Sequence, residues 1–275
     1  MAEKRTGSML CPDCGQIISV NAETCIHCGR KNPGMWGLTP LIRRWLGGAY
    51  GFVPAVIAVC VALFVICLML DPSAIMRPGG MMSLLSPSMK SLYLLGGTGT
   101  FPLQQGRWWT LITAIYLHGG ILHIFFNMLW VKQIGPTVEE FFGTSRLILI
   151  FTVSGVVGFI VSSLFGVPFT IGASGSIFGL LGAMVFYGRS RGGAFGAAVY
   201  RQIGQWALIL FVLGFVMPGV NNWAHGGGFA GGYLTAMFVG YSEQRSESFT
   251  HQILALGCVA LTAISFVLVI WAGFL

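Results

Sequence analysis

Charge is scarce in this sequence, and that scarcity excludes an ordinary soluble protein. Only 8% of the 275 residues are charged, whereas 55% are hydrophobic. Soluble domains carry about 25% charged residues, and about 20 apolar residues suffice to span a bilayer as a helix. We predict seven spans, near residues 51–70, 112–134, 147–166, 172–188, 203–219, 223–241 and 252–275. The expected class is an all-α polytopic membrane protein.

Acidic residues are absent from all of these predicted spans, because the eight in the chain lie in loops or near the N-terminus. This absence argues against a carboxylate proton relay, and it removes the acid of a Ser-His-Asp triad. It also disfavours a transporter or channel, for which we would expect a buried carboxylate or a polar stripe through several spans. Polar groups at membrane depth are costly and tend to be functional. Those that remain are His118, His123, Asn127, Ser174, Asn221, Asn222 and His225, with some hydroxyl residues.

The net charge of +7 is unevenly distributed along the chain. If the N-terminus is cytoplasmic, the predicted outer loops hold only Arg77, Lys90 and Arg107, and all other Lys and Arg residues are cytoplasmic. This is the positive-inside bias, so the basic balance reflects topology, and we do not expect nucleic acid as a partner. Seven spans then place the C-terminus outside. The first apolar run begins near Gly51, too late for a cleavable secretory signal, and the expected location is the bacterial inner membrane.

Four of the seven cysteines lie within residues 1–34, in the segments CPDCG and CIHCG. Two C-x2-C pairs at this spacing predict a tetrahedral zinc site with the ligands Cys11, Cys14, Cys25 and Cys28. About 34 residues cannot build a sizeable core, so the metal would supply the folding energy of a zinc-ribbon-like module. Two disulfides are an alternative that a cytoplasmic location disfavours, and iron in the same cage is a second alternative. His27 is expected to be a bystander.

Residues around this module have simpler expected roles. Residues 15–20 could form one short strand. Residues 35–50 form a juxtamembrane linker, in which Trp36, Arg43, Arg44 and Trp45 are typical of interfacial anchors. The module could regulate the core, cap the N-terminus or bind a cytoplasmic partner, and we favour contact with a protein.

Three motifs combine the polar residues with glycine. In HIFFN, His123 and Asn127 are spaced i, i+4 and therefore share one helix face. In GASGSIFG, Ser174 is followed by a G-x-x-x-G pair, and a second such pair follows His225 in AHGGGFAGG. These glycines allow two helices to touch closely, which would bring a serine hydroxyl within reach of an imidazole, as an activated nucleophile requires. A serine in a glycine-rich span would, taken alone, also fit plain helix packing.

The three motifs, in this order on the second, fourth and sixth spans, resemble those of the rhomboid intramembrane serine proteases. The resemblance covers about residues 50–241. It implies a six-helix core, residues 51–241, whose active site opens to the outer aqueous side. It also implies a Ser-His dyad without an acid. Residues 252–275 would be an additional C-terminal transmembrane helix, a 6+1 layout that occurs in the family.

The resemblance also implies roles for single residues. Ser174 would be the nucleophile and His225 the general base, while His123 and Asn127 would stabilise the oxyanion together with the Ser174 backbone N–H. The supporting positions would be Phe178, packed against the catalytic imidazole, His118, which we expect to be structural, and the motif glycines Gly172 and Gly175. The alternative is that Phe178 is an ordinary hydrophobic side chain that faces the lipid.

One position departs from the family pattern. Trp109-Thr110 stands where the family often has Trp-Arg, and Arg107 lies just upstream. The outer loop over residues 71–107 is too apolar for a solvated linker, and residues 214–222 would lie where the family gates lateral entry of substrate. The expected function is cleavage of transmembrane proteins within the lipid bilayer. The alternative is a non-catalytic rhomboid-like protein that binds membrane proteins and guides their degradation, although such relatives usually lack the serine or the histidine.

Overall fold

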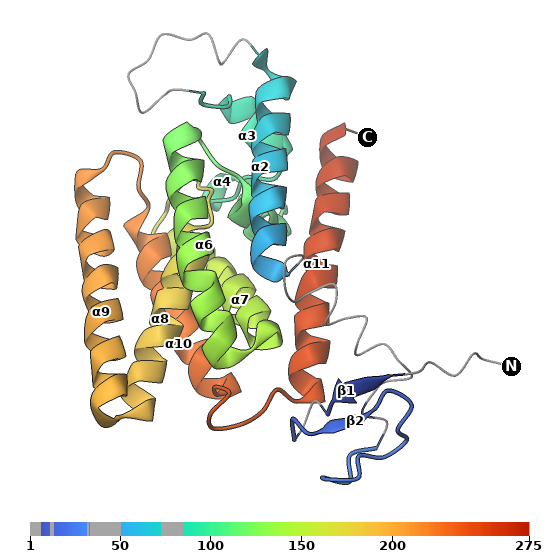
Figure 1. The fold of residues 1–275 in the computed structure, drawn as a ribbon. Coiled ribbons are helices and arrows are strands. Elements are labelled where there is room, and N and C mark those ends of the chain that lie inside the picture. Colours follow the sequence, from blue (N-terminus) through green and yellow to red (C-terminus); the bar gives the residue numbers. More distant parts are fainter. Residues whose placement is uncertain (1–6, 12–13, 32, 34–50, 73–84, 275) are drawn as a thin grey trace, which may run out of the picture.

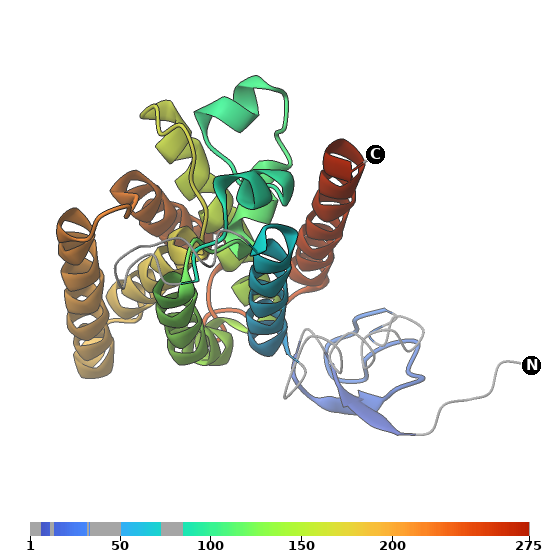
Figure 2. The same ribbon diagram turned by 90° about the horizontal axis from the view of Figure 1, so that it is seen from above.

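The computed structural model describes residues 7–11, 14–31, 33, 51–72 and 85–274. The predicted linker, with Trp36, Arg43, Arg44 and Trp45, lies outside the described residues. The main helices are α2 (Phe52–Leu70), α6 (Ile121–Phe142), α7 (Thr144–Leu164), α8 (Ser174–Arg191), α9 (Gly193–Val216), α10 (Asn222–Val239) and α11 (Phe249–Phe274). They form a bundle, with α11 packed at one side (Figures 1 and 2).

Short elements lie at the two ends of this bundle. One end, which we call the loop end, carries the short helices α3 (Met89–Leu94), α4 (Thr100–Gln104), α5 (Thr110–Thr113) and η5 (Ala114–Tyr116). At the opposite end, the ribbon end, strands β1 (Ser8–Leu10) and β2 (Ile17–Ser19) pair antiparallel, with Met9 opposite Ile18. The predicted strand at 15–20 is thus confirmed in its centre, and its partner β1 was not predicted.

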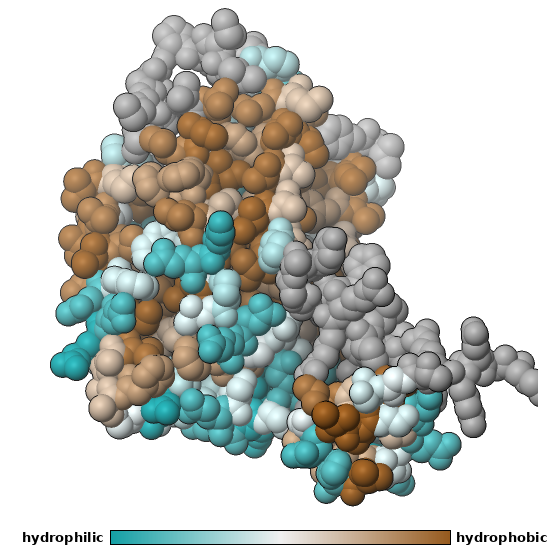
Figure 3. Space-filling model, viewed as in Figure 1, coloured by the Kyte–Doolittle hydropathy of each residue, from teal (hydrophilic) through white to brown (hydrophobic). Residues whose placement is uncertain are grey.

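The described part of the chain has four helices that are long and apolar enough to cross a membrane: α2, α7, α9 and α11. Helix α6, joined to α5 and η5, would be a fifth. Helices α8 and α10 lie where spans were predicted, but their sequences are less apolar than those of the four helices, because both are rich in glycine and α8 also carries Arg189 and Arg191. Figure 3 shows hydrophobic side chains over the upper bundle and hydrophilic ones toward the ribbon end.

Two predicted spans have different bounds in the structure. The span predicted at 112–134 is broken, because the helical segment Thr110–Tyr116 meets α6 at 92°. The break contains Gly119 and Gly120, and glycines readily leave helical geometry. Helix α9 begins at Gly193, ten residues before the predicted start at 203.

Helices α8 and α10 touch through their glycines, as predicted. A Cβ on Gly228 would lie 2.1 Å from the carbonyl oxygen of Gly175, and one on Gly232 would lie 2.0 Å from that of Gly179. Helix α7 joins this contact, since a Cβ on Gly158 would lie 2.6 Å from the oxygen of Ala224. Helices α7, α8 and α10 therefore pack backbone against backbone. This close packing fixes the relative positions of the residues at the ends of the three helices.

A buried polar cluster holds the ribbon end together. Arg146 is fully buried and donates hydrogen bonds to the carbonyl oxygens of Phe142, Val239, Arg245 and Ser246. Glu247 accepts hydrogen bonds from the backbone N–H groups of Ser145 (2.7 Å) and Arg146 (3.1 Å), which are free at the start of α7. The segment that leads into α11 is thus tied to the rest of the core.

Candidate active site

Ser174 is the first residue of α8, at the loop end of the bundle. The preceding residue, Ala173, provides no side-chain hydrogen bond to the helix N-terminus. Alanine is among the poorest residues at this position, so the first N–H groups of α8 are left without a capping side chain. Uncapped N–H groups at a helix N-terminus bind negative charge well. Ser174 itself is half-buried, and a group that develops negative charge beside it would meet these donors.

His225 lies in the first turn of α10, and its ring packs on Phe178 of α8. The two rings are stacked, with centroids 4.3 Å apart and planes inclined by 16°. Phe178 follows Ser174 by four residues, so both lie on one face of α8 about 6 Å apart along the axis. Phe178 is only 4% exposed, so its side chain does not face lipid. The structure therefore brings the His225 ring to the helix face that carries Ser174.

The Ser174 hydroxyl and the His225 ring do not hydrogen-bond to each other in the structure. The Nδ1 atom of His225 is buried and has no hydrogen-bond partner. Catalytic hydrogen bonds are often long in the absence of substrate and tighten when it binds. Ser174 and His225 thus lie in the first turns of two packed helices, without a hydrogen bond between them.

His123, in the first turn of α6, presents a defined donor. The backbone N–H of Gly119 donates to His123 Nδ1 at 3.3 Å. A neutral imidazole carries its hydrogen on the other nitrogen when one accepts, so Nε2 is the N–H donor. That atom lies close above Gly172, where a Cβ would be only 2.7 Å away. Gly172 also has φ +118°, which favours glycine, so a side chain is excluded both by space and by backbone conformation.

Asn127 lies one turn further along α6 and is largely buried. Its Nδ2 group donates to the carbonyl oxygen of His123 at 2.7 Å, which leaves one amide hydrogen free. Its Oδ1 atom is buried without a partner. His123 and Asn127 were predicted to share a face, and this contact between them fits that prediction.

His118 and Arg107 support the surroundings of the site. His118 is fully buried, and its ring packs edge-on against that of His123, with centroids 5.0 Å apart. Arg107 lies over the ring of Tyr93 in α3 at 4.2 Å, and the Thr110 hydroxyl donates to the carbonyl oxygen of Arg107 at 2.6 Å. Arg107 thus makes contacts within the loop end of the bundle, and Thr110 stands where the resemblance led us to expect an arginine.

Asn221 is a residue to which the sequence analysis assigned no role. Its side-chain oxygen accepts from the N–H of Ala224 and caps α10. Asparagine just before an apolar helical segment is a known N-terminal signal, and this signal could have been used. Its amide also contacts Ser162 and Thr170.

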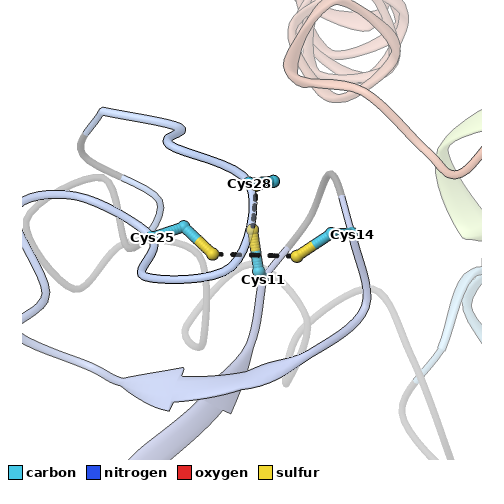
Figure 4. Close-up of side chains that lie close together, drawn as sticks. All are labelled: Cys11, Cys14, Cys25 and Cys28. Atoms are coloured by element: carbon cyan, nitrogen blue, oxygen red, sulfur yellow. Dashed lines mark hydrogen bonds between the residues drawn. The ribbon is translucent and has the colours of Figure 1, made fainter.

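A second centre lies in the ribbon, where the four predicted cysteines converge (Figure 4). Their sulfur atoms all lie within 4.8 Å of one another, and the Cys11–Cys28 and Cys14–Cys25 pairs are each 3.7 Å apart. The cysteines are free. A tetrahedral ion with metal–sulfur bonds of about 2.3 Å requires sulfur separations of about 3.8 Å. The four thiols therefore fit a metal ion, and the described geometry contains no disulfide among them.

The environment of Cys25 also favours a thiolate, the form that binds metals. Burial raises the pKa of this thiol, but hydrogen bonds from the backbone of Cys28 and His27 outweigh burial and lower the pKa to about 6. The neighbouring thiols shift the other way: a backbone hydrogen bond lowers the pKa of each, but burial and hydrogen bonds within the cluster outweigh it, and they raise the pKa of Cys28 to about 12 and also raise that of Cys14. His27 is exposed and does not belong to the cluster of potential ligands.

Comparison with known proteins identifies the class to which this geometry belongs. The Rhomboid domain matches residues 105–242, which contain all eight of the proposed catalytic, oxyanion and supporting residues. The chain therefore belongs to the rhomboid family, whose members include intramembrane serine proteases.

Individual relatives agree with this membership. The chain is 32% identical to "Rhomboid protease GluP" of Bacillus subtilis over 185 residues, 66% of this chain and 35% of the relative. It is 31% identical to "Putative rhomboid protease YdcA" of the same organism, over 52% of this chain and 73% of the relative. It is 38% identical to "RHOMBOID-like protein 4" of Arabidopsis thaliana over 55% of this chain and 39% of the relative. The chain thus spans 35% and 39% of two of these relatives and 73% of the third.

Proposed function

We propose that this protein is a serine endopeptidase that cleaves transmembrane proteins with a dyad of Ser174 and His225. The observation that carries the proposal is the His225 ring stacked on Phe178, one helical turn from Ser174. Membership of the rhomboid family gives independent support. The eight acidic residues of the chain include none between positions 72 and 138, and none between 141 and 242, so neither α8 nor α10 contains a carboxylate.

The reaction would proceed in two steps. His225 accepts the proton of the Ser174 hydroxyl as Oγ attacks the scissile carbonyl carbon. The negative charge on the carbonyl oxygen then faces the N–H groups at the start of α8, the Nε2–H of His123 and the free amide hydrogen of Asn127. His225 passes its proton to the leaving amine, and the acyl-enzyme forms. In the second step His225 removes a proton from water as the water oxygen attacks the ester carbonyl carbon. The bond between this carbon and Ser174 Oγ then breaks, and His225 returns the proton to Oγ.

The substrate would be a transmembrane helix that enters laterally and unwinds near the loop end. This end would face the outside of the bacterial inner membrane, with the ribbon in the cytoplasm and the C-terminus outside. The bias of Lys and Arg toward the predicted cytoplasmic segments supports this orientation. Reporter fusions after residues 34 and 275 should then report opposite sides of the membrane, and the same side for both would refute the topology.

The metal of the ribbon would be zinc, held by Cys11, Cys14, Cys25 and Cys28. Zinc is the usual ion of four-thiolate structural sites, and it would supply folding energy that the small ribbon lacks. Strands β1 and β2 lie at one end of the bundle, and α8, which begins with Ser174, starts at the other end (Figure 1), so the metal would take no part in peptide cleavage. The ribbon would bind a cytoplasmic protein. Metal analysis of the purified native protein should find one zinc per chain, and iron instead would refute this assignment.

The decisive experiment is labelling of the detergent-purified protein with a fluorophosphonate, which reacts with activated serines. The wild type should be labelled, and Ser174→Ala and His225→Ala should not. Ser176→Ala is the matched control, because Ser176 lies two residues further along α8 and is fully buried. No labelling of folded wild type, with no cleavage of a model transmembrane substrate, would favour the alternative of a non-catalytic membrane-protein binding factor.

A further inference from the structure

The side-chain amide of Asn221 makes three hydrogen bonds, which use both of its N–H hydrogens and one of the two lone pairs of its oxygen. Its Oδ1 atom accepts from the backbone N–H of Ala224 at 3.1 Å. A backbone N–H can only donate, so this contact fixes which end of the amide is the oxygen. The Nδ2 group, with two hydrogens, then donates to Ser162 Oγ at 2.6 Å and to Thr170 Oγ1 at 2.9 Å.

These contacts join three separate segments of the chain. Asn221 begins α10, four residues before His225, and Ser162 lies in the last turn of α7. Thr170 lies in the segment between α7 and α8, four residues before Ser174. Ser162 is fully buried and Thr170 is 8% exposed, so water does not compete strongly for these hydrogen bonds.

Thr170 is itself held in place from its other side. Its backbone pairs antiparallel with that of Thr98, through N···O distances of 2.7 and 3.1 Å. The hydroxyl of Thr110, whose hydrogen is donated to the Arg107 carbonyl, can accept a hydrogen bond from the hydroxyl of Thr98 at 3.0 Å. The segment that leads to Ser174 is therefore fixed to the outer loop, and Asn221 fixes the start of α10 to that segment.

We propose that Asn221 is a positioning residue that sets the separation between the His225 imidazole and the Ser174 hydroxyl. This inference rests on the proposed dyad. In a Ser-His-Asp triad an acid orients the histidine, whereas the Nδ1 atom of His225 has no partner. The orientation of the ring then depends on its stack with Phe178 and on the position of the α10 N-terminus. Asn221 is the side chain that ties this N-terminus to the segment of the nucleophile.

The test is saturation kinetics of fluorophosphonate labelling, which separates the maximal labelling rate from the half-saturating concentration. Asn221→Ser keeps an N-cap oxygen but is too short to hold both hydroxyls. It should lower the maximal rate about tenfold, because displacement by 1 Å costs up to about 100-fold. The half-saturating concentration should stay unchanged. Thr170→Val should lower the maximal rate in the same way, and the double variant should be no slower than the slower single variant.

The control is Ser88→Ala, which removes the side-chain N-cap of α3 and touches neither α8 nor α10. It should be labelled at the wild-type rate. An Asn221→Ser variant that is folded, by its thermal midpoint, and labelled within twofold of the wild-type rate would overturn the inference. Additive losses in the double variant would also overturn it. If the wild type is labelled no faster than Ser174→Ala, the proposed dyad itself fails, and the role of Asn221 fails with it.

Discussion

Replacement of Gly228 by alanine tests whether the contact between α8 and α10 sets the geometry of the site. A Cβ at this position would lie 2.1 Å from the carbonyl oxygen of Gly175, and 2.8 and 3.0 Å from its C and Cα atoms. Non-bonded heavy atoms prefer about 3.5 Å or more, so the two helices would have to separate by at least about 1 Å. These are backbone atoms, and no rotation of a side chain can relieve the contact.

The expected effect on catalysis is larger than the effect on stability. Overpacking costs about 1–3 kcal/mol, but alanine regains about 1 kcal/mol of helix propensity over glycine, so the protein should remain folded. A displacement of about 1 Å between Ser174 and His225 should lower the labelling rate about 100-fold. The measurement is the fluorophosphonate labelling rate, compared with the thermal midpoint of each variant.

The matched control is Gly226→Ala on the same helix. A Cβ on Gly226 would meet only Phe211, at an ordinary contact distance of 3.7 Å. This variant should be labelled at the wild-type rate and be as stable as the wild type or slightly more so. If Gly228→Ala were labelled as fast as Gly226→Ala, the backbone contact would not control the separation of the dyad, and the reasoning would be refuted.

Three further predictions address other parts of the molecule. Phe178→Leu should lower the labelling rate about two- to tenfold, because aromatic stacking contributes about 0.5–1.5 kcal/mol. The control is Phe215→Leu on α9, where the side chain is 72% exposed, and its labelling rate should not change. Equal rates for the two variants would contradict a role for the stack. Glu247→Gln should lower stability by about 1–3 kcal/mol through lost hydrogen bonds at the start of α7, while exposed Glu140→Gln should leave the thermal midpoint unchanged. A core that lacks residues 1–34 should be labelled at the full-length rate with or without a chelator; a folded but unlabelled core would refute the independence of the ribbon.

The sequence predicted those parts of the site that depend on spacing within one helix. The i, i+4 spacing of His123 and Asn127 places the Asn127 amide against the backbone carbonyl of His123. The glycine pairs predicted a close approach of α8 and α10, which the structure confirms. Composition and the cysteine spacing likewise predicted the membrane helices and the metal-binding cluster, because each rests on a strong local signal.

Features that depend on contacts between distant segments were not predictable in this way. The 92° bend before α6 was missed because the apolar pattern continues through it. Strand β1 is only three residues long and is defined by its pairing with β2. Buried Arg146 lies just before the predicted third span, and its four carbonyl partners come from α6, from the last residue of α10 and from the segment after α10. Sequence periodicity reports which face of a helix is apolar, but it does not report which distant carbonyl groups converge there.

The arrangement also indicates how a histidine can act here without an acid partner. An acid in a triad orients the imidazole and stabilises its positive charge. In this site the stack on Phe178 and the cap by Asn221 would provide the orientation. The face of an aromatic ring attracts cations, so Phe178 would also favour the imidazolium that forms when His225 takes the serine proton. In the proposed mechanism, the N–H groups at the start of α8 and the Nε2–H of His123 would stabilise the oxyanion that forms at the same moment. Both charges of the transition state would thus be stabilised by neutral groups, which cost less to bury in a membrane than a carboxylate.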